Sequence, residues 1–247
     1  MNKIKLLSGA VASVLLIGLT QNAAAHTRLN ISSATEGQRA INHVIIGHSC
    51  TDTSHTIGTS VVFPDGVDST IVVDGTPHSG PIIDFLTNYG NNVTFFYDRS
   101  AFDYMETKRD ANGNVTGFWA GGGPGMPAGL AVALPFRLAA AAIEPASCAK
   151  SVKVYVSIVD ICEITGVDGF REGTVELWTH NNLGTPFDRV SATDDGPASF
   201  TINRDLTNNP LPESCGAGVA VELKPSAAQI NRDMPIKFNG QQVWPQP

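Results

Sequence analysis

The chain has 247 residues and a formal net charge of −7, from 23 acidic and 16 basic side chains. Nucleic acids and anionic membranes both bind to basic protein surfaces, so this charge argues against either as a partner. About two hundred residues can bury a sizeable core in one unit. We therefore expect a single domain over residues 26–224.

The first 25 residues have the pattern of a secretion signal. Lys3 and Lys5 precede an apolar run over residues 6–19, and small residues stand at Ala23 and Ala25. Cleavage after Ala25 leaves 14 basic side chains against 23 acidic ones, a formal charge of −9. The apolar run is too short and wrongly flanked for a membrane span. We expect an exported protein that is secreted, or attached to the outer surface without a span.

Four cysteines, Cys50, Cys148, Cys162 and Cys215, are present in the expected exported chain. Such a chain favours two disulfides, for which three pairings are possible. The spacing is far from any Cys-x-x-Cys pattern, which argues against a zinc-thiolate site.

Short runs rich in β-branched residues, separated by Gly, Pro, Asn and Asp, predict an all-β protein: a β-sandwich of short antiparallel strands with long irregular loops and few or no helices. The expected strands cover residues 27–31, 40–46, 59–63, 92–97, 115–119, 128–142, 152–161, 173–180, 199–203 and 219–223. The glycine-rich stretch 121–127 predicts a loop. Residues 225–247, which are spaced by prolines, are expected to form a mostly irregular arm.

The strand expected at residues 173–180 ends in Trp178-Thr179-His180. Side chains alternate along a strand, so Trp178 and His180 are expected to share one face. Neutral imidazole is the commonest side-chain metal ligand, and an oxidised indole that carries an amino group could be a second ligand. The alternative interpretation is an aromatic packing residue beside a surface histidine.

Three other histidines are candidate ligands. After signal cleavage His26 would carry both a free α-amino group and an imidazole, which together can chelate copper; alternatively, its position is an accident of cleavage. His48 follows an apolar strand and precedes Cys50 by two residues, which would hold it rigidly. His55 lies in a polar loop and is a weaker candidate.

Four short motifs in the first half of the chain resemble a known copper-binding family. They are His-Thr-Arg-Leu at residues 26–29, Ala-Thr-Glu-Gly at 34–37, Gly-His-Ser-Cys at 47–50 and Phe-Pro-Asp-Gly-Val at 63–67. With Trp119 and the glycines after it, they resemble the YcnI-like exported copper-binding domain over residues 26–138. Bacterial YcnI uses a carboxylate where this chain offers His48, so its ligand set cannot be transferred whole.

Over most of its length this acidic, β-rich chain also resembles the surface-associated copper(I)-binding proteins of methanotrophs, of the CorA and MopE C-terminal type. Trp178-Thr179-His180 matches their Trp-x-His motif. The resemblance implies one copper ion held by two histidines and by kynurenine formed from Trp178. It implies His180 as one ligand and an earlier histidine as the other: His48 first, then His26, then His55.

Two neutral imidazoles with few other donors suit Cu(I), which accepts low coordination numbers, whereas structural zinc takes four ligands. The sequence therefore predicts a copper-binding protein for copper acquisition or storage, and not an enzyme. Two alternatives stay open. One is a copper oxidase or monooxygenase with a histidine brace formed by His26 and a second histidine. The other is a metal-free β-sandwich with an adhesive or structural role at the cell surface.

Overall fold

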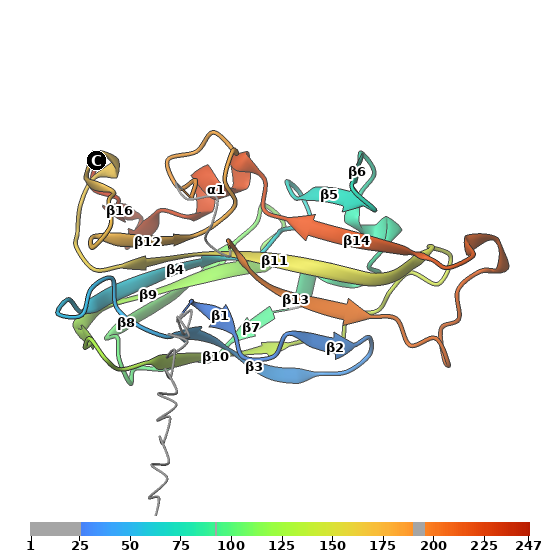
Figure 1. Ribbon diagram of the computed structural model, residues 1–247, viewed down its shortest axis with the longest axis horizontal. Helices are drawn as coiled ribbons and strands as arrows, with labels where there is room; N and C mark the ends of the chain where they lie inside the picture. Colours follow the sequence, from blue (N-terminus) through green and yellow to red (C-terminus); the bar gives the residue numbers. More distant parts are fainter. Residues whose placement is uncertain (1–25, 92, 190–195) are drawn as a thin grey trace, which may run out of the picture.

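The computed structural model describes residues 26–91, 93–189 and 196–247. The secretion signal predicted for residues 1–25 lies outside the described residues. The chain folds as a β-sandwich, as predicted, and the strands of its two main sheets run roughly along the long axis of the molecule (Figure 1). One sheet has four strands and the other has ten.

The smaller sheet has the order β1-β3-β10-β7. Its strands are β1 (Arg28–Leu29), β3 (Ala40–Ile46), β10 (Val132–Leu138) and β7 (Val93–Phe95). Burial alternates along β3 and β10, as a strand with one face on the core requires. The prediction of a strand at residues 128–142 is therefore confirmed for residues 132–138, and the chain on either side of them is not strand.

The larger sheet runs β6-β5-β14-β11-β4-β9-β8, and β12, β13 and β2 lie off this path. The strands on the path are β6 (Thr76–His78), β5 (Thr70–Val73), β14 (Val219–Lys224), β11 (Ala149–Ile161), β4 (Thr56–Val62), β9 (Val115–Met126) and β8 (Tyr104–Arg109). The others are β12 (Val175–Trp178), β13 (Ala198–Asn203) and β2 (Ser33–Thr35).

The long strand β11 organises this sheet. Its first half pairs with β13 on one edge and β14 on the other, and its second half pairs with β4 and β12. Alternate residues Val154, Val156 and Ile158 face the main core, which they share with side chains of the smaller sheet. Val159 and Ile161 face the opposite side and belong to a second core.

Two disulfides form, as predicted, and they fasten both ends of β11. Cys50, just after β3, is bonded to Cys162, just after β11. Cys148, just before β11, is bonded to Cys215, which precedes β14. The described part of the chain contains no free cysteine.

The prediction of a loop at the glycine-rich stretch 121–127 is wrong, because β9 continues to Met126. Gly122, Gly123 and Gly125 have φ values of 76°, 74° and 69°. Glycine alone adopts such angles without strain. The pairing with β4 shifts within this stretch, so the glycines form an irregular bulge inside a strand.

The prediction of a mostly irregular C-terminal arm is also wrong. Residues 225–247 form helix α1 (Ala227–Asp233) and a hairpin of β15 (Ile236–Phe238) and β16 (Gln241–Trp244). The Ser226 side chain caps the helix by accepting a hydrogen bond from the Gln229 backbone N–H. Ile230 and Trp244 are buried in the second core, so this arm covers the outer face of the large sheet (Figure 1).

Loss of either disulfide is expected to destabilise the fold. The crosslinks join residues 112 and 67 positions apart, and loop-closure entropy then gives roughly 4–5 kcal/mol for each. We expect the double variants C50A/C162A and C148A/C215A both to lower the urea midpoint. A midpoint equal to that of the parent protein would show that β11 is held without these bonds.

Candidate metal centre

Strand pairing brings His26 and His48 to the same end of the smaller sheet. β1 and β3 are antiparallel, with Arg28 opposite Ile45. His26 lies two residues before Arg28, and His48 lies three residues after Ile45, so both histidines extend beyond the same end of this pair. His48 is fixed further because Cys50 is covalently tied to the end of β11.

Trp178 covers this end from the larger sheet. In β12 it lies opposite Ile158 of β11, and both side chains belong to the main core between the sheets. The Trp178 ring centroid is 5.0 Å from that of His26 and 6.2 Å from that of His48, with both imidazoles edge-on to the indole. We call His26, His48 and Trp178 the indole cluster.

The two nitrogens of His48 have different surroundings. Nδ1 lies 2.7 Å from the Ser49 carbonyl oxygen, and Nε2 lies 3.7 Å from Glu176 Oε2. A carbonyl only accepts hydrogen bonds, so Nδ1 carries a proton and the neutral ring presents the Nε2 lone pair toward Glu176. A lone pair and a carboxylate face each other favourably when a proton or a metal ion lies between them. Bonds to a first-row metal are about 2 Å long, so one ion can bridge atoms at this separation.

A buried carboxylate lies beneath the indole cluster. Asp160 of β11 is 2% exposed. Its Oδ2 accepts hydrogen bonds from Trp178 Nε1 at 2.9 Å and from Thr27 Oγ1 at 2.5 Å. Burial raises the pKa of the Asp160 carboxyl, and the hydrogen bonds from Thr27 and Trp178 oppose that rise. Asp160 Oδ1 is buried and has no hydrogen-bond partner among the described residues.

His180 does not join the indole cluster. β12 ends at Trp178, and the His180 ring instead contacts that of Tyr155, with centroids 5.0 Å apart. Tyr155 lies on the face of β11 opposite Ile158, because the two positions differ by an odd number of residues. The expectation that Trp178 and His180 share one face is therefore wrong, since regular alternation stops where the strand ends.

The surroundings of His180 favour a neutral ring. Burial, followed by the charge of Lys224, lowers the His180 pKa to about 4, with Glu222 acting in the opposite direction. Its Nε2 is buried and makes no hydrogen bond to any residue that the structure describes.

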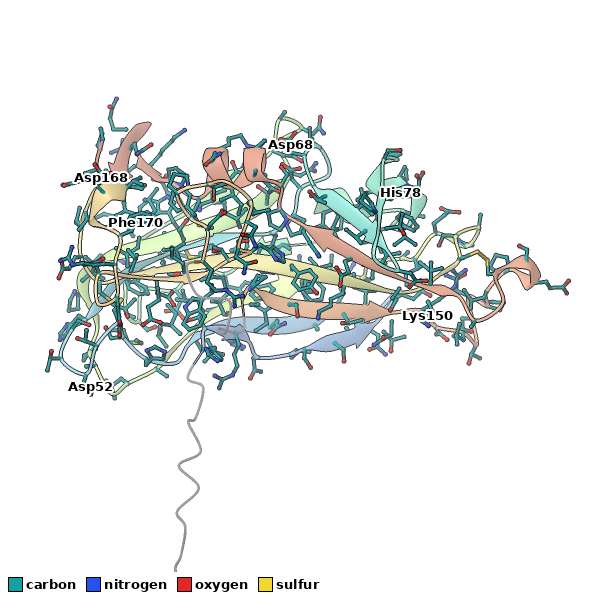
Figure 2. The ribbon with its side chains drawn as sticks, turned by 45° about the horizontal axis from the view of Figure 1, so that its top comes forward. Asp52, Asp68, His78, Lys150, Asp168 and Phe170 are labelled. Atoms are coloured by element: carbon teal, nitrogen blue, oxygen red, sulfur yellow. A yellow bond between two sulfur atoms is a disulfide. The ribbon has the colours of Figure 1, made fainter. Side chains whose placement is uncertain are left out.

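The remaining candidate, His55, lies elsewhere: its Nδ1 is 3.0 Å from the Pro124 carbonyl oxygen, in the glycine-rich bulge. His78, which was not a candidate, is the last residue of β6, and its Nε2 is 2.8 Å from Asp84 Oδ2. Figure 2 shows His78 far along the molecule from Phe170.

A hollow of about 640 Å³ opens beside β12. Its lining includes Glu176 and Trp178, together with the charged side chains of Arg171, Asp188 and Arg189. The indole cluster therefore borders, through Trp178, a hollow lined by both charged and apolar side chains.

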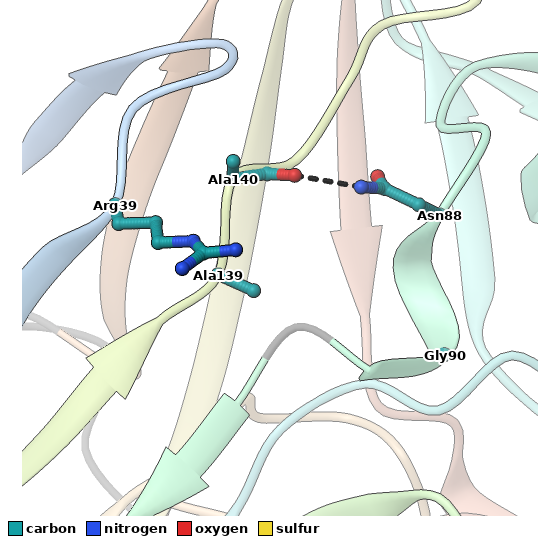
Figure 3. Close-up of a pocket in the computed structure, with 5 residues that line it drawn as sticks. All are labelled: Arg39, Asn88, Gly90, Ala139 and Ala140. Carbon is teal, nitrogen blue, oxygen red and sulfur yellow. Dashed lines mark hydrogen bonds between the residues drawn. The ribbon is translucent and has the colours of Figure 1, made fainter.

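A second hollow lies elsewhere, lined by Arg39, Asn88, Gly90, Ala139 and Ala140, and Asn88 Nδ2 donates a hydrogen bond to the Ala140 carbonyl oxygen at 2.6 Å (Figure 3). Among the described residues, this lining shares no member with the indole cluster.

Asp160 and Glu176 were not identified as candidate site residues from the sequence, although the sequence around each of them indicates a special role. Asp160 is a charged residue next to apolar residues at the end of β11, and a buried polar residue is more informative than a buried apolar one. Glu176 precedes Trp178 by two positions in β12 and so shares its face. In residues 26–91, 93–189 and 196–247, no three His, Cys, Asp or Glu side chains converge as a complete metal-binding group.

No protein-family model matches the sequence, and no curated protein matches it. Among solved structures, a match is an uncharacterized protein from Nocardia farcinica, described as having an immunoglobulin-like fold. The two chains are 13% identical with a TM-score of 0.38, and the match covers 69% of this chain and 92% of that one.

The lowered pKa of His180 predicts a pH-dependent contribution to stability. Its folded-state value of about 4 lies below the ordinary value of about 6.5. Between these values the unfolded chain binds more protons, so this contribution is lost as the pH falls from 6.5 to 4. We expect the parent protein to lose more free energy of unfolding than His180→Gln when the pH falls from 6.5 to 4. Urea unfolding of both proteins at several pH values in this range measures the difference. A difference independent of pH would contradict the buried neutral ring.

Proposed function

We propose that the protein binds one copper ion, as Cu(I), between His26 and His48 beside Trp178, and that it serves copper acquisition or storage. The observation that carries this proposal is that two imidazoles from different parts of the chain both lie edge-on to one buried indole, at centroid distances of 5.0 and 6.2 Å.

The donor chemistry supports copper. Two neutral imidazoles suit Cu(I), which is stable with few ligands, whereas a structural zinc site needs four. Ser49 orients His48 through Nδ1, as partners of metal-bound histidines commonly do, and leaves Nε2 as the donor atom. The carboxylate of Glu176 lies close enough to Nε2 to share an ion with it.

Trp178 contacts both imidazole rings, which supports kynurenine as a third copper ligand, as in proteins of the CorA and MopE type. Dioxygen would cleave the Cγ–Cδ1 bond of this indole and water would then release Cδ1 as formate, leaving kynurenine, whose aromatic amino nitrogen is the former Nε1. In this proposal His26 and His48 are the two histidine ligands, and Trp178 supplies the third after oxidation. His180, predicted as a ligand from the Trp-x-His motif, packs instead against Tyr155.

Two structural features support a place outside the cytoplasm. The chain carries two disulfides, which persist in oxidising compartments. None of the described helices has the length and apolar character needed to cross a membrane. With the predicted secretion signal, these features support a secreted or surface-associated protein that takes up copper through the hollow beside β12.

Alanine substitution of the histidines tests the proposal. His26→Ala and His48→Ala each remove one imidazole donor, so we expect copper retained after gel filtration to fall from one equivalent to well below half. His55→Ala and His180→Ala are the matched controls, since both residues lie outside the indole cluster, and both should retain one equivalent. Copper would be quantified by elemental analysis after loading with Cu(I) under a reductant.

Two results would reject this assignment. If the parent protein retained no copper, the proposed function would be wrong. If His180→Ala lost copper while His26→Ala kept it, the ion would be bound at the Trp-x-His motif and not at the indole cluster.

A further inference from the structure

We propose that Asp160 is a positioning residue that fixes the position of His26 relative to the Trp178 ring. This inference rests on the proposed function for its consequence in copper binding, although the positioning itself is a property of the metal-free chain. Asp160 acts through its hydrogen bonds with Thr27 and Trp178.

One oxygen atom joins the two segments. Asp160 Oδ2 accepts both the Trp178 Nε1–H and the Thr27 hydroxyl, although Thr27 is 133 residues away in sequence. Thr27 is the immediate neighbour of His26 and is only 3% exposed. The Asp160 side chain therefore fixes the backbone next to one proposed ligand and the ring orientation of another.

Because Asp160 is buried, its hydrogen bonds determine which arrangement of the neighbouring side chains is stable. A carboxyl group at 2% exposure has lost most of its hydration, and each hydrogen bond to it offsets part of that cost. The indole N–H and the Thr27 hydroxyl are the described donors to Oδ2. An arrangement that moved either donor away would leave a buried oxygen poorly satisfied, so Asp160 favours the arrangement in which both are present.

His48 provides an internal reference, because it is positioned independently. Its ring is held by Ser49 and by the nearby disulfide of Cys50. Loss of the Thr27–Asp160 contact alone should therefore displace His26 relative to the indole and leave His48 and the indole in place.

The test uses the full-length processed protein in the variants Thr27→Val and Asp160→Asn. Thr27→Val preserves shape and removes one hydrogen bond; Asp160→Asn preserves size but replaces the carboxylate with a neutral amide, whose oxygen is a weaker acceptor and whose NH2 group only donates. Thr116→Val and Asp110→Asn are matched controls, since both are buried residues of the β8–β9 region with no contact to the indole cluster in the described structure. Protein N-terminal sequencing confirms that Thr27→Val is processed like the parent.

The first readout is proton NMR of the metal-free protein. The Trp178 ring current shifts the imidazole protons of His26 and His48 away from their unfolded values. We expect Thr27→Val to reduce the His26 shift by more than half and to leave the His48 shift unchanged, because the indole stays bonded to Asp160. Asp160→Asn also weakens the hold on the indole, so we expect it to change both shifts. If Thr27→Val kept the His26 shift, or if Asp160→Asn left both shifts unchanged, Asp160 would not be a positioning residue.

The second readout is Cu(I) affinity, measured by competition with a chromogenic Cu(I) chelator. We expect each variant to bind Cu(I) about tenfold more weakly, as is typical when the partner of a metal ligand is lost. The double variant should bind no more weakly than Asp160→Asn alone, because both changes remove one linkage. Parent-like affinity in both variants would overturn the inference. A parent protein without copper affinity would reject the proposed function, whereas the NMR readout would still decide the positioning role.

Discussion

The fold depends on β11 being hydrogen-bonded along both edges. Four strands pair with it, and the two disulfides lie immediately beyond its ends. Its two faces contribute to separate cores, one shared with the smaller sheet and one covered by the C-terminal helix and hairpin. A strand enclosed in this way has little freedom to shift. A polar side chain on it therefore has a fixed position, and so do the groups that form hydrogen bonds with it.

Asp160 is that polar side chain, and the indole cluster is built around it. Three segments meet there: the chain before β1, the chain after β3, and β12. The first two meet because β1 and β3 pair, and the third joins because β12 pairs with the end of β11. The imidazoles are held from separate sides, His26 through Thr27 and His48 through Ser49 and Cys50. The proposed copper site is therefore formed by the folded sandwich and not by a local sequence motif.

Much of the fold could be predicted from the sequence, because alternation and turn residues are local signals. The strands at residues 40–46 and 152–161 were predicted in this way. The C-terminal helix was missed because it is short and stabilised by burial of Ile230 in the second core. Trp178, His26 and His48 were identified as candidates, but their meeting depends on strand register. His180 was misplaced because the strand ends two residues earlier than expected.

The most direct test of the account is the intact mass of the protein from its native source, measured under non-denaturing conditions and again after denaturation. The account predicts one copper ion that is lost on denaturation, with a chain a few daltons heavier than its sequence and the added mass located at Trp178 by fragmentation. A metal-free chain at its sequence mass would contradict it, and would leave a β-sandwich whose histidines pack against an ordinary tryptophan.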